Sequence, residues 1–228
     1  MKNLLYVLLL TVFFSCGNDK VVLLPEINHS EITKILDVSP GYLFYDETKT
    51  DSVELNRKNL ISTTNWLINV DKRLTLKQVI PHIKYLQVKK ANSSHKKEGV
   101  KNYFTCNNTS KKNLGFIDFT DVVYIEMTKK DSFPKLTRSE KINQYVITLN
   151  GQNGAIRNAV ENLITKNSDK SHLSESFKNL IKNKHSITEL ILKFNENITF
   201  QEYINFKSIL LKKDIDNVII SKNEYIFN

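Results

Sequence analysis

The residues that could take part in catalysis or bind a metal are scattered along the chain. No two histidines stand three or four positions apart, so the sequence offers no pair of metal ligands on one face of a helix. Asp118 and Asp121 flank the start of a strand-like run, where two carboxylates could share acid–base work. The sequence contains no glycine-rich phosphate loop and no nucleophile elbow. We therefore expect no metal, no cofactor and no catalytic residue, and we interpret the two aspartates as ordinary polar residues.

The cysteine with the most specific context is Cys16, near the start of the chain. Lys2 is followed by an apolar run of 11 residues, Leu4 to Phe14, which is too short to span a bilayer and is typical of an export signal. Ser15-Cys16 closes this run in a pattern that resembles the lipobox of bacterial lipoproteins, although Phe14 is larger than the usual residue. The resemblance implies that residues 1–15 are removed and that Cys16 is diacylated. An uncleaved signal anchor, or an ordinary signal with an incidental cysteine, are the alternatives.

A lipid on Cys16 would decide both location and cysteine chemistry. Two or three acyl chains hold a protein stably on a bilayer. Residue 17 is glycine and not aspartate, so we expect the outer membrane, with the body facing the periplasm. Cys106 would then have no disulfide partner, and its strand-like surroundings predict a small buried side chain.

The chain of 228 residues is basic, with a formal net charge of +9. Such a balance attracts nucleic acid, anionic lipid or acidic polymers. The lysines are nevertheless spread along the chain, in short pairs without interleaved aromatic residues: Lys89-Lys90, Lys96-Lys97, Lys111-Lys112, Lys129-Lys130 and Lys212-Lys213. We interpret them as a solvated surface, and export also argues against a nucleic-acid partner.

A weak internal repeat runs through the chain at an offset of 124 residues. Residues 66–86 align with residues 190–210 without a gap. Each copy begins with a short apolar run that predicts a buried strand, followed by a polar turn. A threonine then precedes Gln78 or Glu202 by three positions, which is the signature of a helix capping box before an amphipathic helix.

Strands are predicted around both copies of the repeat, at 41–45, 102–106, 144–149 and 217–220. Helices are predicted at 53–62 and 155–166, and an additional one at 174–183. Each unit would then alternate strands and helices, with the helices packed on a small sheet.

The strand, polar turn, capped helix and following strand resemble the periplasmic domain of the ExbD/TolR family. Residues 144–228 cover that domain best, and residues 42–106 cover it more loosely. The family's turn aspartate corresponds to Asp71 in the first copy, but the second copy has Asn195. Family members carry a transmembrane helix with an acidic residue, which the Leu4–Phe14 run lacks. The resemblance therefore implies binding of an envelope protein or peptidoglycan, and not proton-driven work.

These observations predict an α+β protein with two small sheet-plus-helix units in tandem behind a lipoprotein signal. The expected divisions are a signal at 1–15, a tether and lead-in segment at 16–40, and units at 41–130 and 140–228. The expected function is a non-catalytic binding or adaptor role toward a protein partner or peptidoglycan. An enzyme with a site that matches no motif, and a structural lipoprotein without a ligand, remain alternatives.

The last predicted strand could also recruit a partner. An open sheet edge can pair with a strand from another chain. The residues expected to form this edge are Asn217, Val218, Ile219 and Ile220. The sequence leaves the oligomeric state open.

Overall fold

The protein is a mixed α/β structure with two sheets and two helices in its described part, in agreement with the predicted α+β class. A computed structural model describes residues 20–128, 131, 142–151, 153–158, 164–169, 179, 187–211 and 217–228. Cys16, the export signal and most of the segment predicted as a helix at 174–183 lie outside these residues.

The first sheet contains six strands. They are β1 (Glu26–Ile27), β2 (Val38–Tyr45), β3 (Val53–Asn56), β4 (Asn65–Val70), β5 (Asn102–Asn108) and β6 (Asn113–Asp118). The order is β1-β5-β4-β2-β3, and β6 also pairs with β5. Helix α2 (Leu76–Ala91) connects the parallel strands β4 and β5 and buries its apolar stripe.

The second sheet also contains six strands. They are β7 (Val123–Met127), β8 (Ile142–Asn150), β9 (Asn153–Asn158), β10 (Ile164–Asp169), β11 (Ile187–Asn195) and β12 (Val218–Phe227), in the order β10-β9-β8-β11-β12-β7. Helix α4 (Phe200–Leu210) connects the parallel strands β11 and β12. Although β7 follows directly on the first sheet's strands, it pairs in the second sheet, parallel to β12.

Four strands of each sheet share one arrangement. The order β5-β4-β2-β3 in the first sheet corresponds to β12-β11-β8-β9 in the second. In both runs the first two pairings are parallel and the third is antiparallel. The strands predicted at 41–45, 66–70, 102–106, 144–149 and 190–194 all lie within these elements, so those predictions are confirmed.

Two predicted helices are wrong. The segment predicted as a helix at 53–62 begins with strand β3, and the segment predicted at 155–166 contains most of β9 and the start of β10. In both cases the chain folds back as a hairpin, so that backbone groups pair with β2 or with β8. The apolar runs involved are too short for periodicity to distinguish a helix from a strand. Pairing with the longer neighbouring strand determines that these segments form strands.

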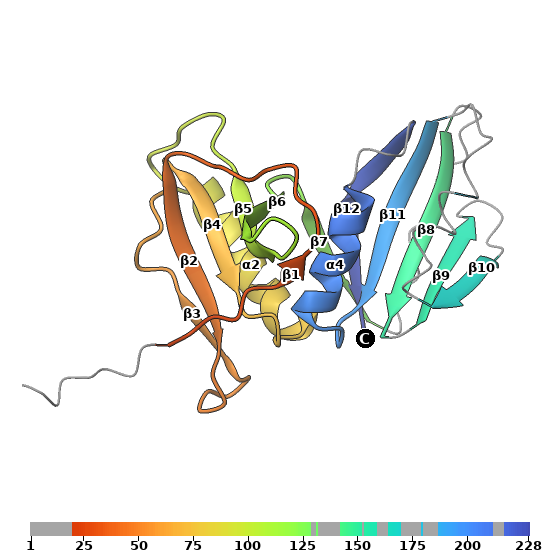
Figure 1. The fold of residues 1–228 in the computed structure, drawn as a ribbon, viewed down its shortest axis with the longest axis horizontal. Helices are drawn as coiled ribbons and strands as arrows, with labels where there is room; N and C mark the ends of the chain where they lie inside the picture. The colour runs from red at the N-terminus through yellow and green to blue at the C-terminus, as the bar shows by residue number, and fades with distance from the viewer. Residues whose placement is uncertain are drawn as a thin grey trace, which may run out of the picture.

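The two capping boxes expected from the sequence are present and meet each other. In α2 the Thr75 backbone N–H donates to Gln78 Oε1 over 2.8 Å, and in α4 the Thr199 N–H donates to Glu202 Oε2 over 2.9 Å. Thr75 and Thr199 form an isolated antiparallel β-bridge. The two helices therefore begin side by side at the junction of the two sheets (Figure 1).

Hydrogen bonds at this junction are reciprocal. The Leu76 N–H donates to the Ile198 carbonyl over 3.0 Å, and the Phe200 N–H donates to the Leu74 carbonyl over 2.6 Å. The two donors, Leu76 and Phe200, are equivalent residues at the offset of 124. The two acceptors, Leu74 and Ile198, are equivalent at the same offset. Equivalent residues therefore contact each other as they would across a two-fold axis between identical subunits.

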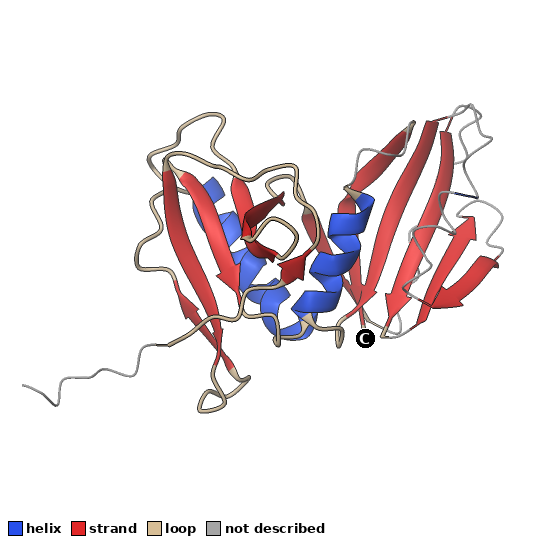
Figure 2. Ribbon diagram, viewed as in Figure 1, coloured by secondary structure: helices blue, strands red, loops and turns tan. Residues whose placement is uncertain are grey.

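Both sheets share one hydrophobic core. Helix α4 lies between the two sheets in Figure 2, and it touches α2 and β1. The Phe104 ring of β5 contacts the rings of Phe200 and Tyr203 on α4, with centroids 5.1 and 6.4 Å apart. Tyr203 in turn contacts Phe194 of β11, at 5.0 Å. Buried side chains thus form a continuous cluster from one sheet to the other.

Candidate functional site

The predicted partner edge lies at the start of β12. Val218, Ile219 and Ile220 form its first three residues, and Asn217 precedes them with a positive φ of 61°. On one side these strand residues pair with β11, from Thr188 to Leu190. Strand β12 is therefore not the outermost strand of its sheet, because β7 follows it on the other side.

The outer side of this edge is nevertheless open in its first half. Strand β7 pairs with β12 only from Asn223 onward, and no other described strand pairs with Val218–Ile220 on that side. Strand β7 begins at Val123, the partner of Asn223, and in the same region the register of β12 against β11 shifts, since Leu190 pairs with Ile220 whereas Leu192 pairs with Glu224. The bulge bends β12, so its two halves face different surroundings.

The backbone polar groups on the open side can be identified. The Thr188 N–H donates to the Asn217 carbonyl over 2.8 Å. In a parallel ladder successive residues direct their backbone groups to opposite sides. The N–H and C=O of Val218 and Ile220 therefore point away from β11. The Ile219 side chain is 56% exposed, whereas the side chains of Val218 and Ile220 pack against the core.

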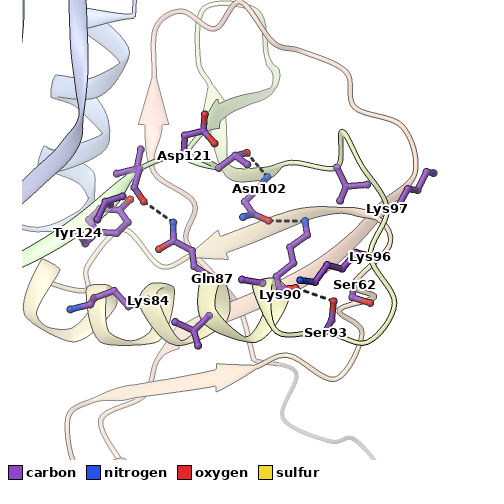
Figure 3. A pocket seen from close by; sticks show the side chains of 16 residues that line it. Ser62, Lys84, Gln87, Lys90, Ser93, Lys96, Lys97, Asn102, Asp121 and Tyr124 are labelled. Atoms are coloured by element: carbon purple, nitrogen blue, oxygen red, sulfur yellow. Dashed lines mark hydrogen bonds between the residues drawn. The ribbon is translucent and has the colours of Figure 1, made fainter.

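A second candidate is a groove beside α2 (Figure 3). It has a volume of about 610 Å³ and lies between the last turns of α2, the loop that follows the helix, and residues 120–124. Its surface is mostly apolar, and Val88 and Val123 are more than half exposed in it. Gln87 donates to the Val122 carbonyl over 2.9 Å, which fixes one wall to the helix.

Four lysines line this groove: Lys84, Lys90, Lys96 and Lys97. They come from two of the lysine pairs interpreted as dispersed surface charge, together with one residue earlier in α2. Folding brings them together because α2 and the loop that follows it both line the same groove. Spacing does place Lys84 and Lys90 on one helix, but no pattern in the sequence indicates where the loop lysines lie.

Lys90 is held by neutral oxygen atoms. Its Nζ donates to the Asn102 Oδ1 over 2.8 Å and to the carbonyls of Thr64 and Lys101 over 3.2 Å each. Figure 3 shows it reaching from α2 to Asn102. It also lies 4.8 Å from the centre of the Trp66 ring. Partial burial lowers the pKa of Lys90 to about 8, and no described carboxylate forms an ion pair with it.

The two aspartates considered for acid–base work have separate partners. Asp118 accepts hydrogen bonds from the Thr120 hydroxyl and backbone and from Lys101. Burial works to raise the pKa of Asp118, but these hydrogen bonds outweigh it and the pKa is lowered. Asp121 is exposed and forms an ion pair of 2.9 Å with Lys222. This arrangement fits structural roles for both residues.

The turn at Asp71 in the first copy of the repeat has a defined structure. The Asp71 side chain is fully buried and accepts hydrogen bonds from the Leu23 N–H and from the backbone and guanidinium of Arg73. In the second copy the Asn195 Oδ1 accepts from the Asn197 N–H over 2.8 Å. Aspartate and asparagine thus make the same bond to the residue two positions later, which explains how the second copy keeps the turn.

A polar cluster is buried between α4, β12 and β7. Glu224 accepts hydrogen bonds from the Lys207 ammonium and, over 2.8 Å, from the Tyr203 hydroxyl. The Tyr203 and Tyr124 hydroxyls lie 3.2 Å apart. Burial raises the pKa values of both tyrosines well above their usual range. No pattern in the sequence indicates that these residues come together.

The remaining candidates are structural. Cys106 is fully buried, as predicted, and burial raises the pKa of its thiol. No group of three or more histidine, cysteine, aspartate or glutamate side chains within the described ranges is placed to hold a metal ion. Among the helices that the structure describes, none has the length and apolar character needed to cross a membrane. No family model, curated protein or solved structure matches the chain.

Proposed function

We propose that the protein is a lipid-anchored envelope protein that binds a partner through the open half of β12 and has no catalytic role. In this proposal Cys16 carries the lipid, the outer membrane holds the anchor, and the body faces the periplasm. The body comprises two ExbD/TolR-like units in tandem. The common order of four strands and the two equivalent capping boxes support this interpretation.

The observation that carries the binding role is the pair of outward-facing backbone groups at Val218 and Ile220. Unpaired N–H and C=O groups on a strand edge can form a new ladder with an extended segment of another protein. The exposed Ile219 side chain would contact the first side chains of such a segment. β7 limits the new strand to the part of β12 that precedes Asn223.

Site-specific photocrosslinking in the intact cell tests the proposal. A photoreactive amino acid at position 219 should give one defined adduct with an envelope protein. The same group at Leu36, which is 70% exposed and lies far along the chain from β12, is the matched control. Equal adduct patterns from both positions would contradict binding at this edge.

A backbone substitution separates strand addition from side-chain contact. Ile220→Pro removes an outward N–H without removing a donor to β11, whereas Ile220→Val retains the N–H. We expect the position-219 adduct to be lost with proline and kept with valine, provided that both variants unfold cooperatively. Binding to isolated peptidoglycan that is unchanged by Ile220→Pro would instead assign the role to another surface.

The anchor is tested separately by mass spectrometry of the protein from native membranes. The proposal requires a first residue at Cys16 with a thioether-linked diacylglycerol. An intact Met1 or an unmodified thiol at position 16 would overturn it. Cys16→Ser should release the body from the membrane fraction.

A further inference from the structure

The groove beside α2 combines an apolar floor with a positive rim. Val88 is 58% exposed and Val123 is 52% exposed, and Val100, Val122 and Ala91 complete the apolar surface. Covering solvated valine side chains with an apolar ligand removes them from water, which favours binding. Pockets for small ligands commonly have this composition, with a few polar groups that fix orientation.

The charge of the groove is positive overall. Lys84 pairs with Glu126 and Lys97 pairs with Asp37, but these carboxylates lie outside the groove lining. The one carboxylate in the lining, Asp121, is bound to Lys222. A ligand entering the groove therefore meets lysines whose charges are only partly offset.

Two of the lysines have no acidic partner among the described residues. Lys90 uses its three N–H donors on neutral oxygens, so its positive charge stays uncompensated in a half-buried position. Lys96, on the loop across from the helix, has no carboxylate of the described chain within ion-pair distance. An anion placed near both could accept a hydrogen bond from Lys96 and would be stabilised by the charge of Lys90, whose three N–H donors are already in use.

We propose that this groove binds a single-chain fatty acid anion, with the hydrocarbon on the valine floor and the carboxylate toward Lys90 and Lys96. The volume of about 610 Å³ accommodates one acyl chain. This site is independent of the β12 edge, and its test does not depend on that proposal. The apolar floor favours a ligand with a hydrocarbon chain, and the lysines of the rim favour a negatively charged head group.

Calorimetric titration of the intact protein with dodecanoate, kept below its micelle concentration, tests the site. Dodecyl maltoside has a similar chain and a neutral head, and it should bind at least tenfold more weakly. Acetate, which has the head group without the chain, should give no measurable binding. Equal affinity for dodecanoate and dodecyl maltoside would show nonspecific detergent binding and overturn the proposal.

Matched variants locate the ligand. Lys96→Gln should weaken dodecanoate binding about 3- to 5-fold, the range for one partly exposed charge pair. Val88→Gln should weaken it to a similar extent by removing apolar surface. Lys34→Gln removes the same charge from an exposed position outside the groove and should have no effect. Equal loss in Lys34→Gln and Lys96→Gln would show that only net charge matters.

Dodecyl phosphate distinguishes the head group. If the carboxylate assignment is correct, dodecanoate should bind as tightly as dodecyl phosphate or more tightly. A phosphate ligand that binds tenfold more tightly would overturn the assignment of a fatty acid.

Discussion

Asp71 shows how a buried carboxylate can stabilise the fold. Burial alone would raise its pKa, but hydrogen bonds from Arg73 and from the Leu23 N–H outweigh burial and lower it. A carboxylate with a lowered pKa contributes stability above its unfolded pKa, near 3.9, and loses that contribution as the pH falls through the folded value. Its effect should therefore be complete at pH 7.

We predict that Asp71→Asn lowers the free energy of unfolding by about 1.5 kcal/mol at pH 7. The amide keeps the turn, as Asn195 does in the second copy, but loses the charge that binds Arg73. Urea denaturation at pH 7 and pH 3 provides the measurement, and the difference from wild type should shrink at the lower pH. Asp37→Asn, in an exposed ion pair, should change stability by less than about 0.5 kcal/mol. A pH-independent effect at Asp71 would show that charge is not the cause.

A second prediction concerns the buried pair Lys207–Glu224. Removing one partner leaves an uncompensated charge in the core, so Lys207→Met should cost about 3–5 kcal/mol. The double variant Lys207→Met, Glu224→Leu removes both charges and should recover most of that loss. Guanidinium denaturation of the wild type, both single variants and the double variant measures the coupling. Simple additivity of the two substitutions would argue that the charges do not interact.

Some residue roles follow from the sequence and others do not. The buried thiol of Cys106 follows from its apolar neighbours. The Lys207–Glu224 pair does not, because its members lie on a helix and on a strand whose packing the sequence leaves open. One signal was available: Lys207 follows Tyr203 by four positions and so falls on the apolar face of α4. A lysine on that face requires a buried acceptor.

At the scale of elements, the helix starts were predictable because a capping box is a local feature. We predict that Thr199→Ala lowers the free energy of unfolding by about 1 kcal/mol, since the alanine cannot accept the Glu202 N–H bond. Thr199→Ser retains the hydroxyl and should lose much less. Thermal unfolding followed by circular dichroism measures both variants. Equal losses would assign the effect to the methyl group of threonine.

The hairpins were less accessible to pattern analysis. Strand β8 turns into β9 at Gly151, which begins the short loop between the paired residues Asn150 and Asn153 and has a positive φ of 57°; glycine at the first loop position is typical of tight hairpins. That signal could have corrected the helix predicted at 155–166. The other hairpin has a longer loop between Tyr45 and Val53, without a comparable glycine. The residues of β3 do not by themselves indicate that it pairs with β2; the pairing becomes apparent only in the folded sheet.

The whole molecule should unfold in one transition, because one buried cluster joins the two sheets. Trp66, the single tryptophan, reports on the first sheet, and circular dichroism reports on both. We predict coincident denaturation curves from the two signals. Phe104→Ala should shift both together by about 3–5 kcal/mol, because its ring contacts α4 as well as its own sheet. Separate midpoints would show two independent folding units.

Long-range topology was the part that sequence analysis could not supply. The turn that follows β6 directs β7 into the second sheet, where it pairs with β12 about 100 residues later. Hydrophobic alternation predicts that a strand forms but does not identify its neighbour. The offset of 124 residues did indicate which segments are equivalent, but not that they meet.

The reciprocal bonds around Thr75 and Thr199 resemble the contact surface of a homodimer, yet both sides belong to one polypeptide. Homodimers dissociate on dilution, because their association depends on the concentration of subunits. Here the connecting chain keeps the second side near the first at any concentration. The unfolding midpoint should therefore stay constant over a hundredfold dilution of the protein. Each molecule would keep this contact even at very low abundance in the cell.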